Sequence, residues 1–278
     1  MPTSNTSACF GRRPVPALHQ AEIARLDQLI AALVLPEDID DSVHATRKGV
    51  KRLRAHLRLI RDGIDKDLYR SEDADLRQIG LLLAQARDAF VLTQTLESLD
   101  SSAGWDSAAA FITAHHQAAV GELLTGPIEE VRRMLVRARR RWPDPGSLTA
   151  GAIAAGVART YGSGREEIET AAATGHAAAF HAWRKRVKYL RYQLEALGSD
   201  EGVVSSLTEL GDCLGLEHDH TVFIQFCDDN IDMLPDRRDR YVLIDRAERR
   251  RDELRSLALA TDLYDRQTEV FIEAVVGE

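Results

Sequence analysis

Apolar residues recur along this chain at the three- to four-residue spacing of amphipathic helices, and the strict alternation typical of β-strands is nearly absent. The pattern is interrupted by glycine, proline or serine at Pro36, Gly63, 101–104, 143–146, Gly175, Gly198 and Pro235. These interruptions predict four helices on each side of residues 143–146. The expected spans are 17–34, 40–62, 67–99, 105–141, 148–172, 177–197, 202–230 and 236–276, with an interruption of the last one near Thr261.

The composition agrees with a wholly helical protein. Alanine and leucine are abundant, and 44% of the 278 residues are hydrophobic, which suffices for one large domain or two small ones. Residues 1–16 contain Arg12 and Arg13 without an apolar segment before them. We therefore predict a disordered tail there rather than a secretory signal.

Two of the predicted helices carry the same basic pattern, 137 residues apart. Each begins with a histidine, followed by arginine at +3, lysine at +4, lysine at +7 and arginine at +10. The first copy contains His44, Arg47, Lys48, Lys51 and Arg54, and the second contains His181, Arg184, Lys185, Lys188 and Arg191. At about 100° per residue, each set lies within about 120° of one helix face, which Arg58 continues in the first copy. The opposite faces are apolar.

Such a face predicts a site for an anion. Like charges three or four positions apart on a helix repel by a few tenths of a kcal/mol per pair. A matched row of cations therefore indicates a function that offsets this repulsion. A solvated basic surface is the alternative interpretation, and the matched repetition argues against it.

A second pair of segments repeats at nearly the same distance. Residues 80–88 and 211–219 share a glycine, leucines, a small residue and a final aspartate, Asp88 or Asp219. An internal duplication accounts for both repeats. We predict two helical bundles, 17–142 and 147–277, related by a pseudo-two-fold axis, with both basic faces converging on a central groove.

Net charge and cysteine content bear on the class of ligand and on the cellular compartment. The formal net charge is −8, but the acids cluster outside the basic helices, so a polyanion site remains compatible with it. The three cysteines form no CxxC motif, which favours reduced thiols and a cytoplasmic protein. No apolar run approaches 18 residues, so no membrane partner is expected.

The histidine-led pattern resembles that of the CHAD family, the conserved histidine α-helical domain, whose hallmark is H-x-x-R-[RK]-x-x-[KR]-x-[LI]-R in two copies. Both copies here match it, with Leu53 and Leu190 at the aliphatic position. The stretches ending at Asp88 and Asp219 resemble the family's second signature, from which the first departs at Ala84 and Arg87. The resemblance covers 17–276 and implies two four-helix bundles that bind inorganic polyphosphate. No β-rich triphosphate-tunnel segment is found, which indicates a stand-alone member that could associate with polyphosphate granules.

The predicted binding residues are the ten cations and histidines of the two patterns, together with Arg58. Arginines would grip phosphate oxygens with forked hydrogen bonds, lysines would act as point charges, and the histidines would donate hydrogen bonds. A second basic layer is predicted at Arg133, Arg137, Arg140, Arg246 and Arg250. Asp88 and Asp219 could orient a basic side chain of the groove, or simply lie on the helix surface.

Other functions fit the sequence less well. Nucleic-acid binding would use the same phosphate contacts and is the second choice, because base stacking recruits exposed aromatics and only 6% of residues are aromatic. Catalysis is disfavoured because no P-loop, nucleophile–base pair or carboxylate cluster is evident. A metal site is disfavoured too, since His218 and His220 diverge by about 200° on a helix. We expect no cofactor, and polyanions other than polyphosphate remain possible ligands.

Overall fold

A computed structural model describes residues 15–33, 38–99, 106–144, 146, 148–231 and 237–276. Their regular secondary structure is helical throughout, which confirms the all-α prediction. The helices are α1 (Val15–Ala32), α2 (Ile39–Leu59), α3 (Lys66–Leu82), α4 (Ala84–Ser98), α5 (Asp106–Leu124), α6 (Pro127–Arg141), α7 (Ala150–Thr174), α8 (Ala177–Leu197), α9 (Glu201–Asp229), α10 (Arg237–Leu259) and α11 (Thr268–Val276), with a short 3₁₀ turn at Arg61–Gly63. The predicted tail falls mostly on residues 1–14, outside the described residues.

Local capping explains where several helices begin and end. The Asp38 and Asp65 side chains accept hydrogen bonds from the first backbone N–H groups of α2 and α3, and Asp200 does the same for α9. Gly175 and Gly198 end α7 and α8 in the left-handed conformation, with φ of 64° and 67°, which glycine adopts without a Cβ penalty.

Two predicted helices are each divided in the structure. The expected helix 105–141 ends at Leu124 and resumes at Pro127, because proline lacks the N–H that a helix interior requires and suits a first helical position instead. The expected helix 67–99 is divided at Leu83, which is fully buried. Nothing in the local sequence marks this second division. The predicted interruption near Thr261 is confirmed, since α10 ends at Leu259.

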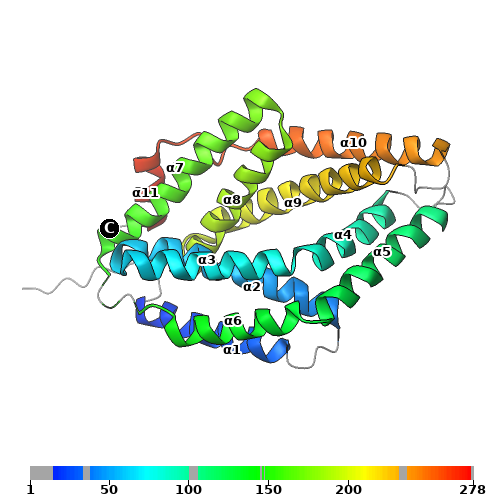
Figure 1. Ribbon diagram of the computed structural model, residues 1–278. Coiled ribbons are helices and arrows are strands. Elements are labelled where there is room, and N and C mark those ends of the chain that lie inside the picture. The colour runs from blue at the N-terminus through cyan, green and yellow to red at the C-terminus, as the bar shows by residue number, and fades with distance from the viewer. Residues whose placement is uncertain are drawn as a thin grey trace, which may run out of the picture.

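Three apolar clusters hold the helices together. The first lies among α1, α2, α3 and α6 and includes Leu26, Leu53, Leu76, Val131 and Leu135. The second lies among α7, α8, α9 and α11 and includes Tyr161, Phe180, Trp183, Leu194 and Leu214. The third joins α4 and α5 to α9 and α10 through Leu92, Ile112, Phe223 and Leu243. Figure 1 shows these helices forming an elongated molecule, with the α4–α5 and α9–α10 pairs reaching toward one end.

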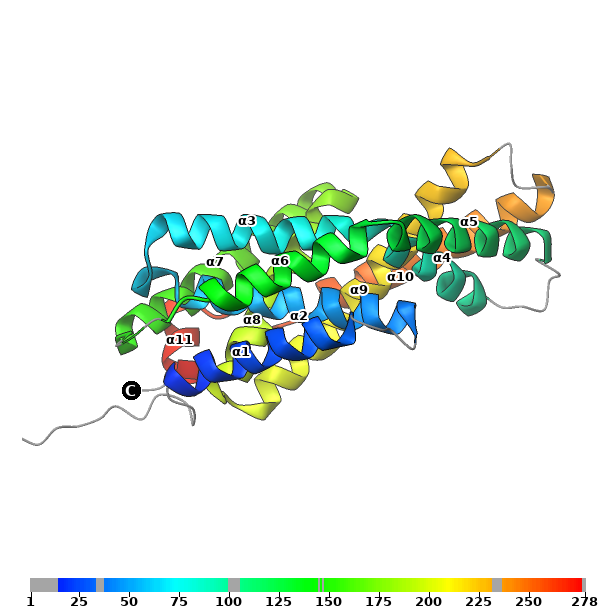
Figure 2. The ribbon, with the colours of Figure 1, turned by 60° about the horizontal axis from the view of Figure 1, so that its bottom comes forward.

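Helices α2 and α8, which carry the two basic patterns, pack against each other in the middle of the fold (Figures 1 and 2). Buried His56 lies with its Nε2 3.0 Å from the Tyr192 carbonyl oxygen, and Gln193 donates from Nε2 to the Ala55 carbonyl at 3.0 Å. These contacts fix the position of one basic helix relative to the other. Among the described helices, none has the length and apolar character needed to cross a bilayer.

Candidate functional site

Helices α2 and α8 bring five of the predicted site residues together. Arg47 and Lys51 on α2 act electrostatically on His181 of α8, and Arg184 and Lys188 of α8 act on Lys51. We call these five residues the cationic cluster. The repeated spacing placed them on equivalent helix faces, and the packing of α2 against α8 turns the faces toward one another.

Helix α9 leaves room for the long side chains of the cluster. A Cβ built on Gly215 would lie 3.8 Å from Nη2 of Arg184 and 4.0 Å from Nζ of Lys188. A Cβ on Gly211 would lie 3.8 Å from Cγ of Lys188. Glycine at both positions lets the two cations extend across the surface of α9, and a larger side chain would occupy the same space.

Arg47 contacts the end of α3, where the chain divides into α3 and α4. Its Nη1 donates to the Gly80 carbonyl oxygen at 2.7 Å, and its Nη2 lies 3.9 Å from Oδ1 of Asp88. Carbonyls in the last turn of a helix lack intrahelical donors and carry partial negative charge, so the end of α3 suits a guanidinium. The Arg47–Asp88 pair also supports the prediction that this aspartate orients a basic residue.

Full protonation of the cluster would place more positive charge there than its surroundings stabilise. Burial, followed by the charges of Arg184 and Lys188, lowers the pKa of Lys51 to about 6. Burial and then Arg184 lower the pKa of Lys188 to about 7. Burial also lowers the pKa of His181 to about 4 and those of Arg47 and Arg184 below their usual range. A bound anion would relieve both the burial of charge and the mutual repulsion.

Two carboxylates flank the cluster. Asp219 on α9 and Asp88 on α4 both favour the charged form of Arg184 and so act to raise its pKa. Burial raises the pKa of Asp88, and the neighbouring charge of Asp219 adds to this effect. The two aspartates that end the second repeated motif therefore both lie beside the cationic cluster.

Two neighbours of the cluster were not among the predicted site residues. The His218 ring lies 4.4 Å from that of His181, centroid to centroid, and burial followed by Arg184 lowers the pKa of His218. Arg87 on α4 lies over the Phe90 ring at 5.4 Å and, after partial burial, contributes most to lowering the pKa of His44. Both residues directly precede an aspartate of the second repeated motif, which was the available signal.

The remaining α2 and α8 arginines of the prediction have acidic partners. Arg54 and Arg58 each place a nitrogen 2.9 Å from Oδ1 of Asp73 on α3. Arg191 is buried, with Nε 3.2 Å from Oε1 of Glu195. Nearer the starts of their helices, His44, Lys48 and Lys185 are exposed. The eleven predicted residues thus fall into a central cluster, an exposed group and a set of ion-paired arginines.

The predicted second layer lies on α6 and α10. Arg133 and Arg137 both pair with Glu130, at 2.8 and 3.3 Å, and Arg250 pairs with Glu253 at 2.9 Å. Arg246 donates to the Leu99 carbonyl oxygen at 3.1 Å, and Arg140 is exposed. A role for this layer stays a prediction.

Comparison with known proteins identifies the family and the fold of the chain. Residues 18–228 match the family profile described as the CHAD domain. The chain belongs to the CHAD family. This CHAD chain is also similar to two solved structures of low sequence identity, which show the fold alone. The crystal structure of the CHAD domain from the plant Ricinus communis matches with 20% identity and a TM-score of 0.60, covering 94% of this chain and 92% of that one. PptA from Streptomyces chartreusis matches with 15% identity and a TM-score of 0.67, covering 91% and 99%.

No curated protein matches the chain. Within the described ranges, no group of three or more histidine, cysteine, aspartate or glutamate side chains is arranged to hold a metal ion.

Proposed function

We propose that this CHAD protein binds inorganic polyphosphate without catalysis, in a groove whose two walls are the basic faces of α2 and α8. The observation that carries the proposal is the convergence of Arg47 and Lys51 with Arg184 and Lys188, one pair from each repeated helix. On this view the chain consists of two duplicated bundles, 17–142 and 147–277, related by a pseudo-two-fold axis through the groove.

The chemistry of the cluster suits a linear chain of phosphates. Polyphosphate carries about one negative charge per phosphate and no bases, so its receptor needs only cations and donors at intervals. Arg184 has room to present its fork across α9, and Lys51 and Lys188 supply point charges. His44, Lys48 and Lys185 would extend the row toward solvent.

The ion-paired arginines would have a secondary role. Arg54 and Arg58 would have to exchange Asp73 for phosphate, and Arg191 would have to exchange Glu195, which reduces their net gain. We therefore place the strongest contacts at the cationic cluster. When no ligand is bound, Asp88 and Asp219 would keep the side chains of the cluster extended.

Nucleic acid remains the alternative ligand, and the aromatic residues argue against it. Tyr189 and Tyr192, which flank the basic row of α8, are 6% and 2% exposed and lie under the guanidinium groups of Arg58 and Arg52. They offer no exposed faces for base stacking. Nucleic acid and polyphosphate would then share only their phosphate contacts with the protein. Polyphosphate presents phosphate groups at the higher density of the two.

The test is direct binding of a long polyphosphate chain, with Lys51→Gln/Lys188→Gln as the site variant. The matched control is Arg70→Gln/Arg249→Gln, which removes two positive charges that are 74% and 75% exposed and paired on their own helices. We expect the site variant to lose at least about tenfold in affinity and the control to bind like the wild type. Equal loss in both would contradict a localised site.

Two further measurements separate the alternatives. Single-stranded RNA should displace polyphosphate only at a large excess of phosphate groups, and stronger displacement by RNA would reverse the choice of ligand. Incubation with polyphosphate and Mg²⁺ should release no orthophosphate, and release would show catalysis.

A further inference from the structure

Two buried side chains tie α2 and α8 to each other through main-chain carbonyl groups. His56 of α2 has its Nε2 3.0 Å from the Tyr192 carbonyl oxygen, and because a carbonyl only accepts, Nε2 is the donor. Gln193 of α8 donates from Nε2 to the Ala55 carbonyl oxygen, also at 3.0 Å. His56 is 3% exposed and Gln193 is fully buried, so water does not compete for either hydrogen bond.

The two hydrogen bonds are exchanged when the two repeats are exchanged. His56 and Gln193 are 137 positions apart, which is the offset of the two basic patterns. The residues that accept from them, Ala55 and Tyr192, are 137 positions apart too. Each donor therefore reaches the residue that precedes its own counterpart in the other repeat. An interface in which one residue meets a second, and the counterpart of the second meets that of the first, is the kind that a two-fold axis produces.

Two more contacts between these helices follow the same exchange. Arg52 of α2 pairs with Glu195 of α8. The guanidinium carbon of Arg58 of α2 lies 4.5 Å from the centroid of the Tyr189 ring of α8. The offset of 137 makes Tyr189 the counterpart of Arg52 and Glu195 that of Arg58. The chemistry of the two contacts differs while their placement is reciprocal, so the reciprocity belongs to the crossing of the helices and not to a single contact.

The reciprocal hydrogen bonds lie about one helical turn from the middle of the cationic cluster. Lys51 and Lys188 are themselves 137 positions apart, and each precedes an accepting residue by four positions. Four residues of α-helix cover about 6 Å and turn by about 40°, so each lysine shares a side of its helix with the accepting residue. The crossing angle and the separation of α2 and α8 at the hydrogen bonds therefore also set the separation of the two lysine backbones.

We propose that His56 and Gln193 are a reciprocal pair of positioning residues, whose hydrogen bonds fix the crossing of α2 and α8 and thereby the spacing of the two walls of the anion site. Both accepting carbonyls lie inside helices and also accept from the residue four positions later, so the side chains add a tie between helices. A binding site works best when supporting residues hold its groups to within about 0.5 Å. The anion as ligand rests on the proposed function, whereas the positioning is a property of the free protein.

The test compares variants that differ in whether residue 56 or residue 193 can donate. Gln193→Leu removes one donor with a side chain of similar size, and the Oε1 of Gln193 has no hydrogen-bond partner to lose among the described residues. Glu22 of α1 lies 2.7 Å from Nδ1 of His56, and removing one member of a buried charged pair is destabilising, whereas apolar replacement of both is tolerated. The second comparison therefore uses Glu22→Leu/His56→Leu, which cannot donate, and Glu22→Leu/His56→Gln, which gives α2 the donor that α8 already has.

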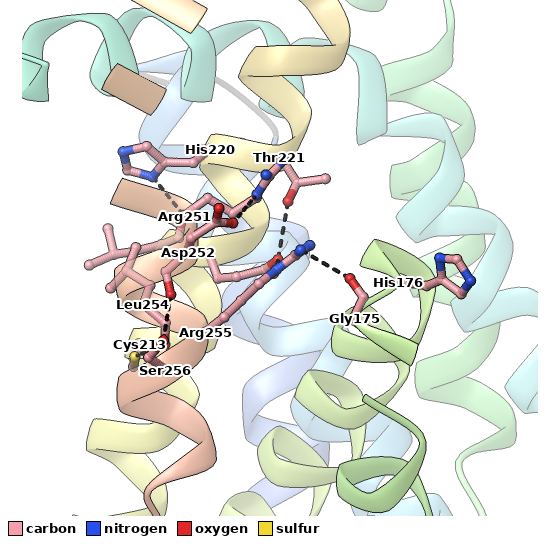
Figure 3. Close-up of polar contacts among 12 residues, drawn as sticks. Gly175, His176, Cys213, His220, Thr221, Arg251, Asp252, Leu254, Arg255 and Ser256 are labelled. Carbon is pink, nitrogen blue, oxygen red and sulfur yellow. Dashed lines mark hydrogen bonds and ion pairs between the residues drawn. The ribbon is translucent and has the colours of Figure 1, made fainter. Parts of the chain in front are cut away.

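Polyphosphate affinity should fall about fivefold in Gln193→Leu, the loss expected for one hydrogen bond. Glu22→Leu/His56→Gln should bind about fivefold more tightly than Glu22→Leu/His56→Leu, although both lack the same charges. Recovery through the glutamine is the result that a merely space-filling role of residue 56 would not produce. The matched control is Cys213→Ala, which should bind like the wild type: it removes a side-chain donor to the Leu254 carbonyl oxygen at 3.3 Å, a tie of the same kind between α9 and α10 (Figure 3).

Cross-linking of the free protein measures the spacing without a ligand. Burial is the main cause that lowers the pKa of Lys51 to about 6 and that of Lys188 to about 7, so both amines are nucleophilic at pH 7.5. A short amine-reactive cross-linker, with the products identified by peptide mass spectrometry, should join these two lysines in the wild type, in Cys213→Ala and in Glu22→Leu/His56→Gln. The yield should fall at least about twofold in Gln193→Leu and in Glu22→Leu/His56→Leu.

The two measurements separate this inference from the proposed function. If the wild type binds no polyphosphate, the proposed function fails and the cross-linking yields still decide the positioning role. If the wild type binds, the inference requires both the recovery by Glu22→Leu/His56→Gln and the loss of cross-linking, and the absence of either overturns it. Cooperative unfolding in urea checks that each variant is folded. Should Gln193→Leu not fold, the two double variants decide between them, and should a double variant not fold, Gln193→Leu decides against the wild type.

Discussion

The affinity of the cationic cluster for polyphosphate should depend steeply on pH. Lys51 and Lys188, with pKa values lowered to about 6 and about 7, are mostly neutral in the free protein at pH 7.5. A bound polyanion stabilises their charged forms and raises both pKa values. A group whose pKa rises on binding takes up a proton, so affinity must be highest at low pH and must fall as pH rises.

The size of the effect follows from these two values. At pH 7.5 both free lysines are mostly neutral, so full protonation in the complex requires the uptake of between about one and two protons per site. At pH 5 both are already charged, and uptake falls to about 0.1. Between pH 6 and pH 8 the affinity should decrease by at least about tenfold if both lysines stay charged in the complex. His44 and His181, whose pKa values are also lowered, add further uptake in the same direction.

Isothermal titration calorimetry in buffers of different ionisation enthalpy measures this uptake directly. Long chains should be used so that terminal phosphates contribute little. The matched variant is Lys51→Arg/Lys188→Arg, whose guanidinium groups stay charged at every pH of the experiment. Its uptake at pH 7.5 should be at least about one proton lower than that of the wild type. Binding without proton uptake by the wild type, or equal uptake by the variant, would refute the assignment of charge states.

Three further predictions concern packing, ion pairing and salt. Gly156→Ala should lower the free energy of unfolding by about 1–3 kcal/mol, because its Cβ would lie 2.6 Å from the Leu59 carbonyl oxygen; an unchanged urea midpoint would contradict this close approach of α7 to α2. Asp73→Asn should destabilise the protein at neutral pH, because Arg54 and Arg58 hold the pKa of Asp73 below its usual range. Denaturation curves of wild type and variant should converge as pH falls through that lowered value, where the wild-type carboxyl is protonated too, and a constant difference would argue against the pair. Polyphosphate affinity should fall about fifty-fold between 50 and 200 mM salt for four phosphate contacts, and a salt-insensitive affinity would exclude the electrostatic site.

Helix boundaries could be predicted where their causes are local. Asp38 precedes the first basic helix, and Gly175 and Gly198 end their helices through a conformation that glycine alone adopts cheaply. The division at Leu83 could not be predicted, because it accompanies a contact from Arg47 to Gly80, 33 residues away. A tertiary hydrogen bond leaves no mark in the local pattern of apolar and polar positions.

The candidate site, too, could be predicted from the sequence only in part. The spacing of the two copies placed Arg47 and Arg54 on one face of α2, and by periodicity the two are equivalent. They differ because Asp73 on α3 pairs with Arg54, whereas Arg47 meets a helix end and the more distant Asp88. Which cation pairs closely with a carboxylate depends on what the neighbouring helix presents, and that follows from packing rather than from the period of one helix.

The basic face is therefore divided along its length, and the division has a functional consequence. Toward the ends of α2 and α8, Asp73 neutralises arginines of α2 and joins α3 to that helix, and Glu195 neutralises Arg191 of its own helix. Near the middle of α8, α9 presents Gly211 and Gly215 to Arg184 and Lys188, and Asp219 of α9 offsets only part of the cost of burying these two cations. Charge that is neutralised internally stabilises the fold, and charge left uncompensated stabilises a complex. The repeated motif supplies both kinds from one row of residues, and we place the proposed site where the neighbouring carboxylates compensate the cations only in part.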